Sequence, residues 1–221
     1  MFIRKYKSLM LILFFTLLIS IQLVDAKVNS ILPLEGKIIT IDPGHGGRDS
    51  GTMSGKLMEK DLNLEISYQL KKVLEENGAT VYMTRMVDED LSSKWDARKK
   101  RGDLYRRILF IQNKKSDLYL SIHINAGNGR GQEVLYHSIN KNNLLLAESI
   151  HNEFKKEFKT KRIIKKTNLY LYSNTRVPGV LIECGFLSNP NDRYLLQKED
   201  YQKRLALSIT RGVYEYFQKE L

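Results

Sequence analysis

The chain has 221 residues, of which 42% are hydrophobic and 28% are charged. This composition excludes a low-complexity or repeat protein, and the length suits one domain with a substantial core rather than two domains. A net charge of +11 favours an anionic partner or surrounding, and the single cysteine excludes an intrachain disulfide.

The first 26 residues have the pattern of an export signal. Three basic residues precede an apolar run that ends at Val24, and Val24-Asp-Ala26 provides a small-residue cleavage pattern. The run is slightly shorter than the roughly 20 residues that span a bilayer comfortably. We therefore predict a cleaved signal peptide or a retained N-terminal membrane anchor at 1–26. The domain at 27–221 would then work outside the cytoplasm.

The remaining domain is still basic. Without residues 1–26 it has 33 basic and 24 acidic residues, a net charge of +9. A basic exported domain favours cell-wall polymers or a membrane surface as partners. Export argues against nucleic acid, and simple solubility is the alternative explanation of the charge.

The first half of the domain alternates strand and helix. Residues 37–42 form an apolar run that predicts a buried strand. Apolar residues then recur at helical spacing from Leu62 to Leu74, with Asp61 as a candidate N-cap and Asn77-Gly78 as a stop signal. Residues 79–84 predict the next strand. This βαβ order predicts parallel neighbouring strands.

The second half continues the alternation after a polar stretch at 86–102. A helix carries Leu104, Ile108 and Ile111 at helical spacing. Further strands are predicted at 117–124, 132–137, 169–172 and 180–184, and further helices at 144–158 and 205–217. The whole order predicts a single α/β domain with a largely parallel sheet.

Four reactive side chains fall at one edge of this predicted sheet, where open α/β sheets bind their ligands. His45 follows the first strand, His123 ends the third, and Glu183 ends the strand at 180–184. Glu59 lies just before the first helix, on the loop that leaves His45. Two imidazoles and one carboxylate with an open fourth position are typical of catalytic zinc. Glu183 would then take a proton from the attacking water and pass it to a leaving nitrogen.

Each residue also has a plainer interpretation. The stretch IDPGHGGRDSG at 41–51 lacks the glycine pattern of nucleotide-binding loops, so it is not a phosphate cradle, but His45 could be a turn residue. His123 could bind a backbone carbonyl, and Glu59 could be a solvated charge at a helix start. Glu183 has the weakest such alternative, because an unpaired carboxylate in an apolar run is costly.

Three other reactive side chains are expected outside the site. Neighbouring residues on a strand point to opposite faces, so Cys184 faces the core if Glu183 faces the cleft. A buried core cysteine is therefore favoured over a thiol nucleophile. His137 trails a strand, and His151 falls on the polar side of a helix.

Five segments resemble the zinc-dependent N-acetylmuramoyl-L-alanine amidases in order and spacing, namely IDPGHGGRDSG, EKDLNLEIS, VYMTR, DLYLSIHINA and VPGVLIECGFLSN. The resemblance runs from about Lys37 to the C-terminus. It implies a single α/β domain of phosphorylase/hydrolase-like type, with a twisted, mostly parallel sheet of about six strands flanked by helices. It also implies hydrolysis of the amide that joins the lactyl group of N-acetylmuramic acid to L-alanine of the peptidoglycan stem peptide.

The resemblance also implies roles for individual residues. His45, Glu59 and His123 match the zinc ligands, and Glu183 matches the catalytic glutamate. Two further residues are candidates for substrate contacts, with a structural role as the alternative for Arg85 and a role in shaping the cleft as the alternative for Asn125.

A narrower resemblance, to the germination-specific amidases of spore-forming bacteria, rests on ARKKRGDLYRRI at 97–108 and on the compact architecture. It implies that stem peptides are removed in the spore cortex so that muramic-δ-lactam can form, with an accessory lipoprotein as partner. The alternatives are a vegetative autolysin of the same family, a non-catalytic peptidoglycan-binding protein, and a zinc peptidase or deacetylase. The basic stretch Arg98–Arg107 is either a solvated helix face or a patch that meets the anionic wall or a protein partner.

Overall fold

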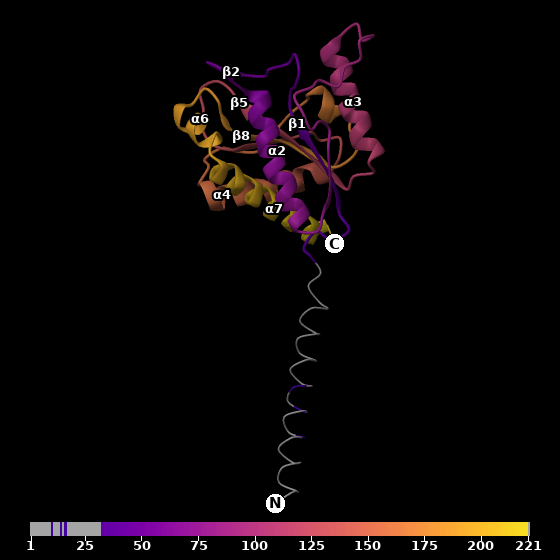
Figure 1. The fold of residues 1–221 in the computed structure, drawn as a ribbon, viewed down its shortest axis with the longest axis vertical. Coiled ribbons are helices and arrows are strands. Elements are labelled where there is room, and N and C mark those ends of the chain that lie inside the picture. Colours follow the sequence, from indigo (N-terminus) through magenta and orange to yellow (C-terminus); the bar gives the residue numbers. More distant parts are fainter. Residues whose placement is uncertain (1–9, 11–13, 15, 17–31, 221) are drawn as a thin grey trace, which may run out of the picture. The chain divides into compact units, whose positions relative to one another are not determined.

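The structure is a computed structural model that describes residues 10, 14, 16 and 32–220. Within it, Leu34–Leu221 form one compact unit whose six-stranded sheet carries helices on both faces (Figure 1). The predicted export segment at 1–26 lies outside the described residues, apart from residues 10, 14 and 16. No described helix is both long and apolar enough to cross a membrane.

The sheet has the strand order β4-β1-β5-β8-β6-β7. β4, β1, β5 and β8 are parallel to one another, β6 is antiparallel to β8, and β7 is parallel to β6. A separate two-stranded ribbon, β2 with β3, lies in the loop before the first long helix. The strands are β1 (Ile38–Pro43), β2 (Met53–Ser54), β3 (Leu57–Met58), β4 (Thr80–Met83), β5 (Leu118–Asn125), β6 (Glu133–Tyr136), β7 (Lys165–Lys166) and β8 (Gly179–Phe186). The predicted α/β class with a mostly parallel sheet is confirmed.

The helices divide between the two faces of the sheet. α2, α4 and α7 pack together on one face and enclose the main core, whereas α3 and α5 enclose a smaller core on the other face (Figure 1). The helices are α2 (Glu59–Glu76), α3 (Lys99–Asn113), α4 (Asn142–Phe158), α5 (Tyr170–Ser173), α6 (Pro190–Leu196) and α7 (Glu199–Glu220).

The alternation of side chains along the strands determines which face of the sheet carries the candidate site residues. Along β5 and β8, every second side chain enters the main core beneath α2, α4 and α7. The side chains between them point to the other face, where Tyr119 and Leu181 pack in the smaller core. His123 and Glu183 continue that second series at the carboxyl ends of the same strands. The candidate site therefore lies on the face that also carries α3 and α5.

Two sequence-based predictions about the elements are wrong. The segment predicted as a strand at 169–172 instead forms the short helix α5. A brief apolar run does not distinguish a strand from a helical turn, because both can bury apolar side chains. In α5 the buried side chains are Leu171 and Tyr172. α2 begins at Glu59 rather than after an N-cap at Asp61. Its first amides are satisfied by the preceding loop, since Glu59 N donates to Thr52 O at 2.9 Å and Lys60 N donates to Ser50 O at 3.2 Å.

Candidate metal centre

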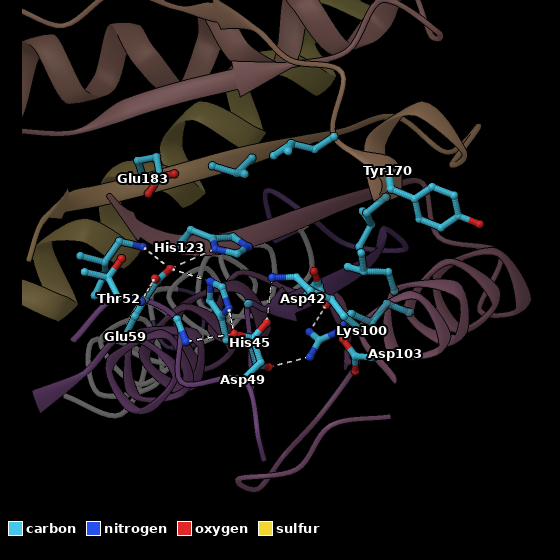
Figure 2. A pocket seen from close by; sticks show the side chains of 18 of the residues that line it. Asp42, His45, Asp49, Thr52, Glu59, Lys100, Asp103, His123, Tyr170 and Glu183 are labelled. Atoms are coloured by element: carbon cyan, nitrogen blue, oxygen red, sulfur yellow. Dashed lines mark hydrogen bonds and ion pairs between the residues drawn. The ribbon is translucent and has the colours of Figure 1, made fainter. Parts of the chain in front are cut away.

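Three of the predicted side chains converge at the carboxyl ends of β1 and β5. His45, Glu59 and His123 each offer a ligand atom, and these atoms all lie within 4.8 Å of one another. His45 Nε2 and His123 Nδ1 are each 3.1 Å from the same oxygen, Oε1 of Glu59. The two imidazole rings meet edge to face with their centroids 5.0 Å apart (Figure 2). This arrangement could hold one metal ion.

The glycine-rich turn after β1 aims His45 at this cluster. His45 itself has φ 61°, a left-handed conformation that is uncommon outside glycine. Paired backbone hydrogen bonds between Gly46 and Asp49 close the turn, at 2.9 and 3.1 Å. Gly44 makes room for the second imidazole, because a Cβ there would lie 2.2 Å from Cε1 of His123. The glycines therefore shape the turn and admit both rings.

Glu59 is fixed through both of its carboxylate oxygens. Oε1 accepts a hydrogen bond from Ile124 N at 3.1 Å, and Oε2 accepts one from Thr52 N at 2.8 Å. Burial alone would raise the pKa of Glu59, but hydrogen bonds and charge interactions with His123 and His45 outweigh it and lower the pKa strongly. The carboxylate is therefore ionised, which is the form that binds a cation.

A second carboxylate lies beside His45. Oδ1 of Asp49 lies 3.0 Å from Nδ1, on the opposite side of the ring from Glu59. Burial would lower the pKa of His45, but the carboxylates of Glu59 and Asp49 outweigh it and raise the pKa. A carboxylate beside the second ring nitrogen is a common feature of metal-binding histidines, because it fixes the tautomer and the ring orientation.

Glu183 faces the cluster from β8 (Figure 2). Its Oε2 is buried and has no hydrogen-bond partner among the described residues. Burial, and then the nearby carboxylates of Glu59 and Glu133, raise the pKa of Glu183 to about 8. A carboxyl group with a raised pKa can both accept and release a proton near neutral pH.

A cavity of about 680 Å³ includes all four side chains. It extends beyond them toward α3 and α5, where Lys100, Leu104 and Tyr170 line it. The cavity is therefore larger than these four side chains require, and a ligand bound at them could extend toward α3 and α5.

A buried ion pair supports the His45 turn, and the sequence analysis missed it. Nη1 of Arg107 donates to Oδ1 of Asp42 and to Pro43 O, both at 2.8 Å. Nη2 of Arg107 donates to His45 O at 2.6 Å. Burial would raise the pKa of Asp42, but the charge of Arg107, aided by hydrogen bonds, lowers it.

The basic stretch Arg98–Arg107 is interpreted above as a solvated helix face or as a patch that meets a partner. Arg107 fits neither interpretation, because it is only 1% exposed. The sequence contains a signal of this burial. Arg107 lies three residues after Leu104 and four before Ile111, on the apolar stripe of the helix.

The two candidate substrate contacts lie in different environments. Asn125 lines the cavity, and its Nδ2 donates to Oε2 of Glu133 at 3.3 Å. Arg85 is 2% exposed and is not among the described residues that line the cavity. Its guanidinium is occupied by backbone carbonyls. The structure therefore does not support Arg85 as a substrate contact.

Three residues expected outside the site indeed lie outside the described lining of the cavity. Cys184 is fully buried in the main core, as predicted, and burial raises the pKa of its thiol. His137 accepts a hydrogen bond from Ile139 N. His151 was predicted on the polar side of its helix, and this is wrong, because it is buried on α4 with 3% exposure.

The chain is similar to known proteins over most of its length. Residues 39–215 match the family model for N-acetylmuramoyl-L-alanine amidase. The germination-specific N-acetylmuramoyl-L-alanine amidase of Bacillus subtilis (strain 168) is 41% identical over 194 residues, which cover 84% of this chain and 82% of that protein.

Two solved structures are similar in fold and sequence. The CwlD amidase from Clostridioides difficile, in complex with the GerS lipoprotein, has a TM-score of 0.78 and 32% identity, covering 83% of this chain and 100% of that one. The catalytic domain of CwlV, from Bacillus (Paenibacillus) polymyxa var. colistinus, has a TM-score of 0.71 and 29% identity, covering 82% and 98%.

Proposed function

This chain belongs to the N-acetylmuramoyl-L-alanine amidase family, and we propose that it hydrolyses an amide bond of its substrate with a zinc ion held by His45, Glu59 and His123. The bond is the one between N-acetylmuramic acid and L-alanine in peptidoglycan. The observation that carries the zinc assignment is the convergence of two imidazoles and one ionised carboxylate, with Glu183 facing them.

The donor set fits zinc better than the hard cations. Magnesium and calcium prefer oxygen ligands, whereas zinc commonly binds two imidazoles and one carboxylate and keeps a fourth position open. Bound zinc would supply a Lewis acid that polarises the scissile carbonyl and acidifies water. The ligand carboxylate is already held by the amides of Ile124 and Thr52, which supports a preorganised site.

Glu183 is proposed as the proton carrier of the reaction. Its carboxylate takes a proton from the water that attacks the lactyl carbonyl carbon. It then gives that proton to the alanine nitrogen as the C–N bond breaks, which leaves a lactyl carboxyl group and a free amino terminus. The raised pKa and the unpartnered Oε2 support this role. Asn125, which lines the cavity, is proposed as a substrate contact.

We place the enzyme in the spore cortex, where removal of stem peptides would allow muramic-δ-lactam to form. The similarity to a germination-specific amidase supports this role. The basic, apolar pattern of residues 1–26 supports export, with a cleaved signal or a membrane anchor. An accessory lipoprotein is proposed as a partner, because the similar amidase from Clostridioides difficile is in complex with one.

A product assay tests the proposed reaction. Metal-free protein is incubated with purified peptidoglycan that retains its stem peptides, with and without one equivalent of zinc, and the products are analysed by mass. The proposal predicts zinc-dependent release of peptides with free L-alanine amino termini and intact glycan chains. Shortened peptides would indicate a peptidase, free amino sugars a deacetylase, and binding without products a wall-binding protein.

A second assay tests the place of action. The cortex of spores from cells that lack this protein should contain stem peptides at the positions where muramic-δ-lactam normally forms. A normal lactam content in that muropeptide profile, with altered vegetative walls, would instead indicate a vegetative autolysin.

A further inference from the structure

Arg85 carries a buried charge that does not line the cavity. The residue is 2% exposed, and in the described part of the chain its guanidinium forms hydrogen bonds to backbone carbonyls but no ion pair with a carboxylate. A buried charge without a counter-ion is costly unless hydrogen bonds compensate for it. The hydrogen bonds of Arg85 therefore indicate what it does.

All four of these hydrogen bonds go to backbone carbonyls, in three separate segments of the chain. Nε donates to Pro43 O at 3.0 Å, and Nη2 donates to Gly44 O at 2.9 Å. Nη2 also donates to Lys60 O at 2.8 Å, and Nη1 donates to Val87 O at 3.1 Å. The planar fork of the guanidinium is suited to holding several acceptors in fixed directions.

Two of those carbonyls are next to proposed metal ligands in the chain. Gly44 directly precedes His45, and Lys60 directly follows Glu59. One atom, Nη2 of Arg85, therefore joins the turn that carries His45 to the start of the helix that carries Glu59. The contact is close, because a Cβ at Gly46 would lie 2.9 Å from Nε of Arg85.

We propose that Arg85 is a positioning residue of the metal centre, which sets the separation between the backbone at His45 and the backbone at Glu59. The inference rests on the proposed zinc site. Arg107 holds the same turn, but its described partners are Asp42, Asp103 and the turn itself, so it does not reach α2. Arg85 therefore links the two ligand-bearing segments, together with Asn63 Nδ2, which donates to Gly44 O at 3.2 Å, and Lys60 Nζ, which donates to Gly47 O at 2.9 Å.

The test compares Arg85→Lys with wild-type protein. Lysine keeps the charge but has one nitrogen on a flexible stem, so it cannot hold the three segments together in the same geometry. We expect the folded variant to bind zinc ~10–100-fold more weakly in a chelator competition, the range typical for lost outer-shell partners. The visible absorption spectrum of the cobalt-substituted variant should also change. Activity should recover at saturating zinc, since Arg85 is not among the described residues that line the cavity.

A matched control separates positioning from general stability. Phe154→Leu alters a fully buried side chain of α4 in the main core. It should lower the melting temperature while zinc affinity and the cobalt spectrum stay those of the wild type. Arg85→Gln serves as a second variant, because it removes the buried charge and also removes the link.

Each outcome is decisive. Wild-type protein that takes up no zinc would refute the proposed function and this inference together. If the wild type takes up zinc and both Arg85→Lys and Arg85→Gln bind zinc with the wild-type affinity, this inference alone is refuted. If neither variant folds, Arg85 belongs to the core of the fold and the positioning role is equally wrong.

Discussion

His123 and Glu183 are direct partners in the register of the parallel strands β5 and β8. Paired residues on adjacent strands point to the same face, so the sheet itself fixes Glu183, the proposed proton carrier, relative to His123, a proposed metal ligand. The register shifts immediately afterwards, between His123 and Asn125. Such irregularities often re-aim side chains beside active sites, and here the shift occurs where Asn125 enters the cavity.

Loss of an imidazole should weaken metal binding strongly. We expect His123→Ala to bind zinc more weakly by at least the ~10–100-fold typical of a lost outer-shell partner, and to release no peptides. The metal content after dialysis and the peptide-release rate measure both effects. His137→Ala is the control, because this histidine lies outside the cavity lining, and it should match the wild type. Full zinc content in His123→Ala would contradict the ligand assignment.

Two glycines with the same backbone conformation provide a test of ligand packing. Gly51 and Gly55 have φ of 64° and 60°, so alanine strains the backbone similarly at both, by ~1 kcal/mol. A Cβ at Gly51 would lie 2.6 Å from Oε2 of Glu59 and 2.7 Å from Cδ2 of His45, whereas a Cβ at Gly55 meets nothing within 4 Å.

Gly51→Ala should therefore lose zinc affinity, and Gly55→Ala should lose only stability. Zinc titration and thermal melting of the two variants side by side distinguish the effects. Equal zinc affinity in both variants would show that the ligand cluster tolerates displacement.

The pH dependence should report the ionisation of Glu183. A general base acts when deprotonated, so kcat/KM should rise with pH through the pKa of this carboxyl group and level off above it. Burial and neighbouring carboxylates raise that pKa to about 8 without a cation, and a bound cation would lower it. The rise should therefore lie below pH 8, measured as peptide release between pH 5 and 9. A rate that increases as the pH falls would contradict the assignment.

The buried pair of Asp42 and Arg107 should contribute to the acid sensitivity of the fold. Removing one partner of a buried pair costs ~3–5 kcal/mol, so Arg107→Met should lose about that much unfolding free energy in urea. The matched control is Arg106→Met, because the Arg106 side chain is 36% exposed in its pair with Asp96, and such a pair contributes about 1 kcal/mol or less.

The pKa of Asp42 also sets the sign of the pH effect. Its folded pKa is lowered from the ordinary 3.8, so its stabilisation is present above that pH and is lost as the pH falls toward the folded pKa. Asp42→Asn should remove this acid-dependent component, measured by urea unfolding at pH 3 and pH 6. An unchanged pH slope would contradict the role of this pair.

Several features of the site could be predicted from the sequence because they depend on periodicity and topology. Strand ends locate His123 and Glu183 at one edge, since parallel strands bring their carboxyl ends together. Alternation on β8 separates Glu183 from Cys184, and the structure confirms that the thiol is buried in the core. The single α/β domain follows from the order of the strands and helices.

The remaining features depend on tertiary contacts. Helical spacing places Arg107 on an apolar stripe, but no local pattern identifies its partner Asp42, which is far away in the chain. Most partners of Arg85 are backbone carbonyls far away in the chain, and a carbonyl is the same at every residue. The start of α2 at Glu59 depends on carbonyls of the preceding loop rather than on a capping side chain. His151 is buried, and the apolar residues Ala147 and Phe154, about one helical turn away on α4, are a signal of this burial that the prediction missed.

Glu183→Gln tests the proposed proton transfer most directly, with zinc content and peptide release measured on the same preparation. Glutamine keeps the shape of the side chain but cannot take up a proton. We expect one zinc per chain, as in the wild type, together with loss of peptide release from purified peptidoglycan. A variant that keeps its zinc and releases peptides at the wild-type rate would refute Glu183 as the proton carrier.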